Sequence, residues 1–242
     1  ADLPELRHGV TTRRGGVSRG AYATLNVGLG SGDEPGAVQE NRRRVTRAVG
    51  VDAFRAPRQV HGATVQRVTA RAAAPGDGDA LATDAPGMGV AVIGADCPLV
   101  LLVDPRRRSL AVVHSGWRGT LSAVVPATIR AMRAWFETSP ADLHVGIAPS
   151  IEGTCYEVGA DVHDAFAQRM PLALDAFAVD AAGRMTLDVA HVIRGQLLEL
   201  GVSAARVETM PGCTYCDDAD WFSHRRDGPR TGRHALVAGW SA

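Results

Sequence analysis

Three short segments of the chain each contain one side chain that can bind a metal ion, and each also contains a Gly or Pro that bends the backbone. The segments are Gln59-Val60-His61-Gly62, Ala95-Asp96-Cys97-Pro98 and His114-Ser115-Gly116-Trp117-Arg118-Gly119. Two imidazoles and one thiolate, from His61, Cys97 and His114, suit a zinc ion whose fourth position stays open to water or substrate. An open position is typical of catalytic zinc, so the three segments predict a metalloenzyme.

The same side chains allow two other chemistries. Copper competes with zinc for this ligand set because it also accepts imidazole and thiolate ligands. Without a metal, Cys97 could act as a nucleophile activated by His114 or His61, as in cysteine hydrolases and deamidases. Zinc bound to the thiolate would block that nucleophile, so the two uses exclude each other at any instant. Asp96, beside Cys97, is predicted to orient the site or handle a proton, or else to cap a strand end.

A basic segment near the C-terminal end predicts an anion pocket. Residues 223–228 include His224 and Arg225, have Arg230 and Arg233 nearby, and directly follow an aromatic pair. Arginine side chains match phosphate oxygens with two parallel hydrogen bonds, whereas a solvated surface is the simpler alternative. Arg118 lies where a helix is expected to begin, and the start of a helix also favours anions.

The first thirty-six residues are crowded with glycine and predict irregular backbone. Backbone of this kind near Ser18 and Asn26 could approach a polar ligand closely. Both residues are therefore predicted to contact substrate.

The remaining cysteines have no assigned chemistry at this point. Cys213-Thr214-Tyr215-Cys216 could be half of a structural zinc site or a redox pair, but only Cys155 is left to complete it. We expect these thiols to pack beneath the site.

Length and composition exclude several classes of protein. The 242 residues are 45% hydrophobic and suit one large domain or two small ones, with one as the default. Basic and acidic side chains balance at 26 each, so no overall field favours nucleic acid or an anionic membrane. No lysine is present, which excludes Schiff-base chemistry. No apolar run reaches the roughly 20 residues of a membrane span, and residues 1–10 lack a signal-peptide pattern, so we expect a cytoplasmic protein.

Apolar runs and glycine turns predict the elements that position these residues. Strands buried on both faces are expected over 89–93, 99–103, 109–113, 143–148 and 234–240. Helices are expected over 40–49, 120–136, 159–170 and 187–200. Residues 56–68 predict two extended pieces joined at Gly62, which places His61 at a strand end, and 73–78 predict a loop. The mixture indicates an α/β or α+β protein with a mixed sheet.

Together these motifs resemble those of the YfiH-like, laccase-domain proteins over nearly the whole chain. Besides the three ligand segments, the resemblance extends to residues 12–18 with 22–28, 40–42, 146–149 with 155–159, and 213–216 with 222–228. Departures are small: Pro98-Leu99 stands where Leu-Pro is usual and Ser115 where Ala is common, and neither removes a ligand.

The resemblance implies an activity that spacing alone does not. The family was first described as multicopper polyphenol oxidases and is now regarded as zinc-dependent purine nucleoside enzymes. It implies phosphorolysis of adenosine, inosine and guanosine, cleavage of methylthioadenosine and deamination of adenosine. It also implies zinc on His61, Cys97 and His114, purine nucleosides and phosphate as partners, and one domain over residues 1–242 with four layers, α/β/β/α.

Two rival activities stay open. A copper-dependent polyphenol oxidase (laccase) requires several coppers, and eight mostly scattered His argue against such a cluster. A cysteine-type hydrolase or amidase acting on a peptidoglycan precursor is the better rival, because the same cleft and Cys97 could serve it.

Overall fold

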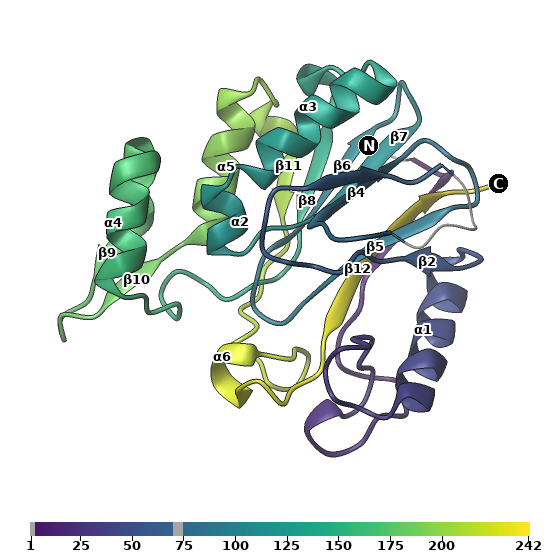
Figure 1. Cartoon of the computed structure of the whole chain (residues 1–242), viewed down its shortest axis with the longest axis horizontal. Coiled ribbons are helices and arrows are strands. Elements are labelled where there is room, and N and C mark those ends of the chain that lie inside the picture. The colour runs from purple at the N-terminus through teal and green to yellow at the C-terminus, as the bar shows by residue number, and fades with distance from the viewer. Residues whose placement is uncertain (1–2, 70–74) are drawn as a thin grey trace.

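Two β-sheets lie between layers of helix in the computed structural model, which describes residues 3–69 and 75–242 (Figure 1). Across the larger sheet the strands are β11 (Val207–Thr209), β8 (His144–Ile147), β6 (Leu99–Asp104), β7 (Ser109–His114), β4 (Ala80–Thr83) and β3 (Val65–Arg67). Across the smaller sheet they are β1 (Leu6–Val10), β12 (His234–Trp240), β5 (Gly89–Gly94) and β2 (Phe54–Arg55). Each sheet combines parallel and antiparallel pairs, which confirms the predicted α/β class with mixed sheets.

Three hydrophobic cores separate the layers. One lies between the larger sheet and the helices α3 (Val124–Phe136) and α5 (Val189–Glu199), the second between the two sheets, and the third between the smaller sheet and α1 (Pro35–Val49). On β6, Val100 and Leu102 belong to the first core, while Leu99 and Leu101 belong to the second. Such a strand needs apolar side chains in succession because both of its faces are buried. The order helix, sheet, sheet, helix confirms the expected four layers.

The predicted long helix over 120–136 is two helices instead of one. α2 (Trp117–Leu121) ends before Ala123, whose φ of 59° is left-handed, and α3 begins at the next residue. Pro126 is therefore the third residue of α3 and lies in its first turn. The N–H groups of a first turn have no partner within the helix, so proline is tolerated there.

The region 56–68 also departs from the prediction. Its second piece is β3, but the preceding strand, β2, ends at Arg55, and residues 57–61 form a loop with one isolated bridge from Arg58 to Asp77. His61 therefore lies in a loop and not at a strand end. The loop predicted over 73–78 is described only from residue 75 onward, since residues 73 and 74 lie outside the described residues.

Other helices agree with the prediction, and short elements were missed. α1, α4 (Ala160–Arg169) and α5 cover the expected segments, although α1 begins at Pro35. The missed elements are β1, β4, β11, the hairpin of β9 (Phe177–Val179) and β10 (Met185–Leu187), and α6 (His224–Asp227). Each spans five residues or fewer, which is too short for hydrophobic periodicity to identify.

The predicted ligand segments meet where the two sheets join. The connection from β5 to β6 runs from the smaller sheet to the larger one and contains Cys97, while His114 ends β7 beside it. None of the helices in the two described ranges has the length and apolarity needed to cross a lipid bilayer.

Candidate metal site

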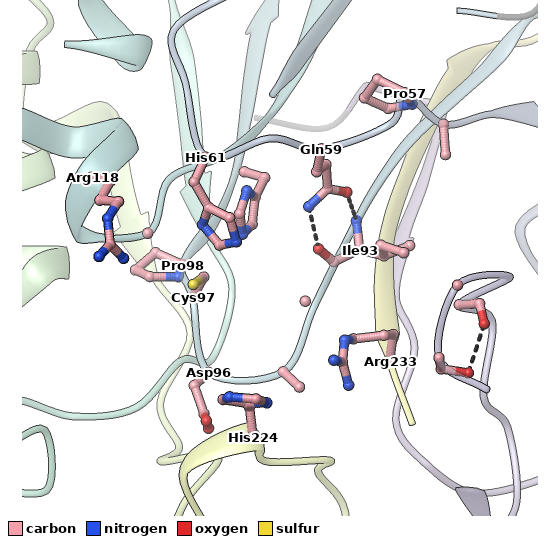
Figure 2. A pocket seen from close by; sticks show the side chains of 18 of the residues that line it. Pro57, Gln59, His61, Ile93, Asp96, Cys97, Pro98, Arg118, His224 and Arg233 are labelled. Atoms are coloured by element: carbon pink, nitrogen blue, oxygen red, sulfur yellow. Dashed lines mark hydrogen bonds between the residues drawn. The ribbon is translucent and has the colours of Figure 1, made fainter. Parts of the chain in front are cut away.

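His61, Cys97 and His114 converge on one point in a cavity of about 920 Å³ (Figure 2). Their ligand atoms all lie within 4.8 Å of one another, and the two imidazole rings meet edge to face with centroids 4.9 Å apart. Zinc binds nitrogen and sulfur at about 2.0–2.3 Å, so three atoms at this spacing can share one ion. The three residues that the sequence predicted as ligands therefore form a site that fits a metal.

A buried carboxylate, Asp79, orients two of these ligands. Its Oδ1 lies 2.8 Å from Nδ1 of His114, which leaves Nε2 of that ring free to face the cavity. The same carboxylate accepts backbone N–H groups from Val60 at 3.2 Å, His61 at 3.0 Å and Gly62 at 2.7 Å. Metal-binding histidines commonly donate their second ring nitrogen to such a carboxylate, which fixes the tautomer and the ring orientation.

These hydrogen bonds explain why His61 is held in a loop. Its φ of 57° is left-handed, a conformation that residues other than glycine rarely adopt. Asp79 takes the N–H groups that a strand would give to a neighbouring strand. On the other side of the loop, the side chain of Gln59 forms two hydrogen bonds of 2.8 Å with the backbone of Ile93 (Figure 2). The loop is thus fixed to both sheets.

Gly116 leaves the space in which the ligands approach each other. A Cβ at this position would lie 2.7 Å from Sγ of Cys97 and 3.3 Å from Nδ1 of His61. The requirement for glycine is therefore one of space, and any side chain would push the Cys97 sulfur aside.

Charges around the ligands favour binding of a cation. Burial opposes charge on His114, but the adjacent Cys97 and the hydrogen bond with Asp79 raise the pKa of His114 to about 9. Burial and the neighbouring His114 lower the pKa of His61, so this imidazole is neutral and its lone pair is available. Burial disfavours the Asp79 carboxylate, yet its hydrogen bonds to His114 and to the 60–62 backbone lower its pKa. A metal that binds here replaces the proton on His114.

Asp96 has both carboxylate oxygens engaged in holding other segments. Oδ1 accepts the Thr214 hydroxyl at 2.7 Å, and Oδ2 accepts the backbone N–H of Arg225 at 2.7 Å. Asp96 is buried and carries a φ of 97°. Through these contacts it fixes the start of α6 against the loop that contains Cys97 (Figure 2). The sequence predicted that Asp96 orients the site, handles a proton or caps a strand end. These contacts favour the first role, in which Asp96 positions the segment of His224 and Arg225.

Arginines line the same cavity. Arg118, His224 and Arg225, all predicted from the sequence as substrate-binding residues, are on its wall together with Arg42 and Arg233. Among the described residues, none of these five forms an ion pair; Arg225 donates to the Glu157 carbonyl and Arg118 lies over Trp117. Because α2 spans only five residues, the Arg118 guanidinium and not a helix start provides the positive charge.

Ser18 and Asn26 lie behind the cavity wall. Neither is among the lining residues. The Ser18 hydroxyl and the Asn26 amide both donate to Asp33, at 2.6 and 3.0 Å, and Asn26 Oδ1 accepts the backbone N–H of Arg233 at 2.8 Å. The expected direct contact with a ligand is therefore replaced by support for the wall, since Arg233 lines the cavity.

The sequence did not identify Asp79 or Arg42 as parts of the site, whereas Arg233 was noted beside the basic segment that predicted an anion pocket. Asp79 directly precedes the buried strand β4, and that position was the only signal. Arg42 belongs to a segment noted only as an Arg-rich helix. Only the fold brings Arg42 and Arg233 to one wall.

The chain matches one family model over residues 7–241, described as multi-copper polyphenol oxidoreductase laccase. It belongs to this family. Curated relatives are named purine nucleoside phosphorylase: one from Deinococcus radiodurans is 39% identical over 98% of this chain and 93% of its own. Another, from Streptomyces coelicolor, is 41% identical over 94% of this chain and 92% of its own.

Solved structures of similar proteins share the fold. YlmD from Geobacillus stearothermophilus aligns with a TM-score of 0.91 at 32% identity, covering 99% of this chain and 93% of that one. The YfiH protein of Bacillus licheniformis aligns with a TM-score of 0.90 at 30% identity, covering 97% and 92%. The architecture is thus that of the YfiH-like laccase-domain proteins.

Replacing Asp79 with Asn is expected to weaken zinc binding about 10- to 100-fold, because an amide cannot accept all four hydrogen bonds or hold the His114 tautomer. Competition with a chromogenic chelator measures the affinity. Asp84→Asn, which removes an exposed carboxylate after the same strand, should leave it unchanged. Equal affinity in a folded Asp79→Asn protein would refute the orienting role.

Proposed function

We propose that this chain is a zinc-dependent purine nucleoside phosphorylase that also cleaves methylthioadenosine and deaminates adenosine. One observation carries the proposal: a three-ligand site suited to zinc shares a cavity with four arginines that lack acidic partners among the described residues. The names of the curated relatives support the phosphorylase part. A cavity of about 920 Å³ is large enough for a nucleoside and a phosphate.

Phosphorolysis requires a phosphate held against the anomeric carbon of the ribose. Arg118 and Arg225 are proposed to hold it, since both line the cavity, Arg118 near the candidate metal ligands and Arg225 on α6. Arg42 and Arg233 add positive charge from the opposite wall. Burial lowers the pKa of both, but arginine stays charged at neutral pH.

The departing or reacting purine needs a hydrogen-bond donor. Burial raises the pKa of Tyr156 to about 12, so its phenol stays protonated and can donate to the base. Bound zinc supplies a Lewis acid and lowers the pKa of coordinated water to about 7, as deamination requires. Asp96 is proposed to act through Arg225 and His224 by fixing the start of α6.

A second candidate has its own support. Cys97 is adjacent to His114, and Asp79 lies 2.8 Å from Nδ1 of the same ring, so the three residues also form a Cys–His–Asp arrangement, as in cysteine hydrolases. This arrangement supports the mechanism of a cysteine-type hydrolase or amidase, and a peptidoglycan precursor as its substrate stays a hypothesis. A copper-dependent laccase has less support, because three His line the cavity among the residues that the structure describes, too few for several coppers.

Purified zinc-loaded protein is expected to convert adenosine to adenine and ribose 1-phosphate only when phosphate is present, and to inosine with or without phosphate. Cys97→Ala should lower both rates more than about 100-fold while the circular dichroism spectrum is unchanged, because a direct ligand is lost. Product analysis by liquid chromatography checks both reactions. Rapid oxidation of phenols with no product from any purine nucleoside would overturn the assignment.

Arg118→Gln is expected to raise the KM for phosphate at least about tenfold, since a charge-assisted contact is lost, while deamination continues. Arg130→Gln, which changes an exposed arginine on α3, is the matched control and should affect neither reaction. An unchanged KM for phosphate in Arg118→Gln would move the phosphate site elsewhere in the cavity.

A further inference from the structure

A second group of sulfur atoms lies beside the cavity. The Sγ atoms of Cys155, Cys213 and Cys216 all lie within 4.8 Å of one another, and those of Cys155 and Cys216 are 3.2 Å apart. All three are free thiols, and none of them lines the cavity. We propose that these three thiols form a second zinc site, which binds the ion as thiolates and is separate from the candidate catalytic site.

The backbone around Cys213 is arranged to stabilise a thiolate. The N–H of Glu152 points at its sulfur from 3.4 Å, and the N–H groups of Tyr215 and Cys216 point at the same atom from the turn that follows. A Cys-x-x-Cys turn with inward N–H groups supplies two ligands from one short loop.

The third ligand comes from a loop already attached to this turn. A bridge pairs Ser150 with Cys213, and the N–H of Thr214 donates to the Ser150 carbonyl at 3.1 Å. This pairing brings Cys155, five residues after Ser150, to the exposed Cys216. The convergence therefore follows from the path of the backbone.

Spacing and number favour a metal over a disulfide. Zinc–sulfur bonds of about 2.3 Å in tetrahedral geometry place the sulfurs about 3.8 Å apart, within the range that the three atoms span. A disulfide would use two sulfurs and leave unexplained the donors that point at Cys213. Since Cys216 is exposed, the fourth position of the ion faces solvent.

The ion would tie together two segments of the cavity wall. Tyr156 directly follows Cys155, and Arg225, which lies over the Tyr156 ring at 4.7 Å, belongs to the segment that begins at Cys213. Zinc at the cysteines would therefore hold the wall that carries these two side chains. Because the ligand sets do not overlap, this site and the candidate catalytic site can be tested separately.

Zinc content distinguishes the two sites. Protein purified under reducing conditions and dialysed against Zn²⁺ is expected to contain two zinc ions per chain by plasma mass spectrometry. Cys97→Ser should keep the one at the three cysteines, and Cys155→Ser/Cys216→Ser should keep the one at the histidines. With Co²⁺ in place of zinc, the sulfur charge-transfer band of Cys97→Ser should be about three times that of the double variant, because three thiolates bind instead of one.

Two results would overturn the second site. One is a wild-type protein whose only zinc disappears in Cys97→Ser. The other is evidence of a disulfide between Cys155 and Cys216. In a thiol titration with denaturant and chelator but no reductant, such a disulfide would leave two of the four thiols of the chain free in the wild type, and all three remaining thiols free in Cys155→Ser. If Cys155→Ser/Cys216→Ser misfolds, a second comparison starts from Cys97→Ser, which lacks a ligand of the candidate catalytic site. Chelator is expected to lower the Tm of Cys97→Ser, but not that of Cys97→Ser/Cys216→Ser, in which the exposed Cys216 is also replaced.

Discussion

The buried carboxylate of Asp79 is the interaction on which the site depends. An ionised carboxylate without partners inside a protein costs several kcal/mol, and this one has no exposed surface. Three backbone N–H groups and the His114 ring offset that cost by satisfying both oxygens. The same four hydrogen bonds set the left-handed loop of His61 and the tautomer of His114, so the geometry of two ligands follows from one residue.

The layered fold determines what else reaches the ligands. The chain crosses from the smaller to the larger sheet between β5 and β6, and Cys97 lies on that crossing. Asp96, its neighbour, binds the start of α6 from far along the sequence and so brings His224 and Arg225 to the cavity. Basic side chains and the candidate metal ligands thereby line one cavity, although about 130 residues separate Cys97 from Arg225.

Much of this arrangement could be predicted from the sequence, and the exceptions have physical causes. The strands β5, β6 and β7 were identifiable because burial on both faces demands continuous apolar runs, and Cys97 and His114 follow from their positions next to these strands, whereas His61 lies in a loop. The break at Ala123 was not identifiable, because alanine gives no signal for a left-handed conformation. Ser18 and Asn26 were assigned to the ligand because a glycine-rich loop has the same composition whether it contacts substrate or an internal network. Asp79 was missed because its role arises only from the packing of a loop against β4. The choice of substrates came from family resemblance and not from residue spacing.

Diffraction data collected at the zinc absorption edge, from crystals soaked with phosphate and a non-hydrolysable adenosine analogue, test the central claim most directly. The account predicts an anomalous peak about 2.0–2.3 Å from Sγ of Cys97, Nε2 of His114 and a ring nitrogen of His61, with phosphate against the cavity arginines. Clear density for the analogue in a cavity whose three ligand side chains bind no metal, from protein shown to turn over adenosine, would contradict it.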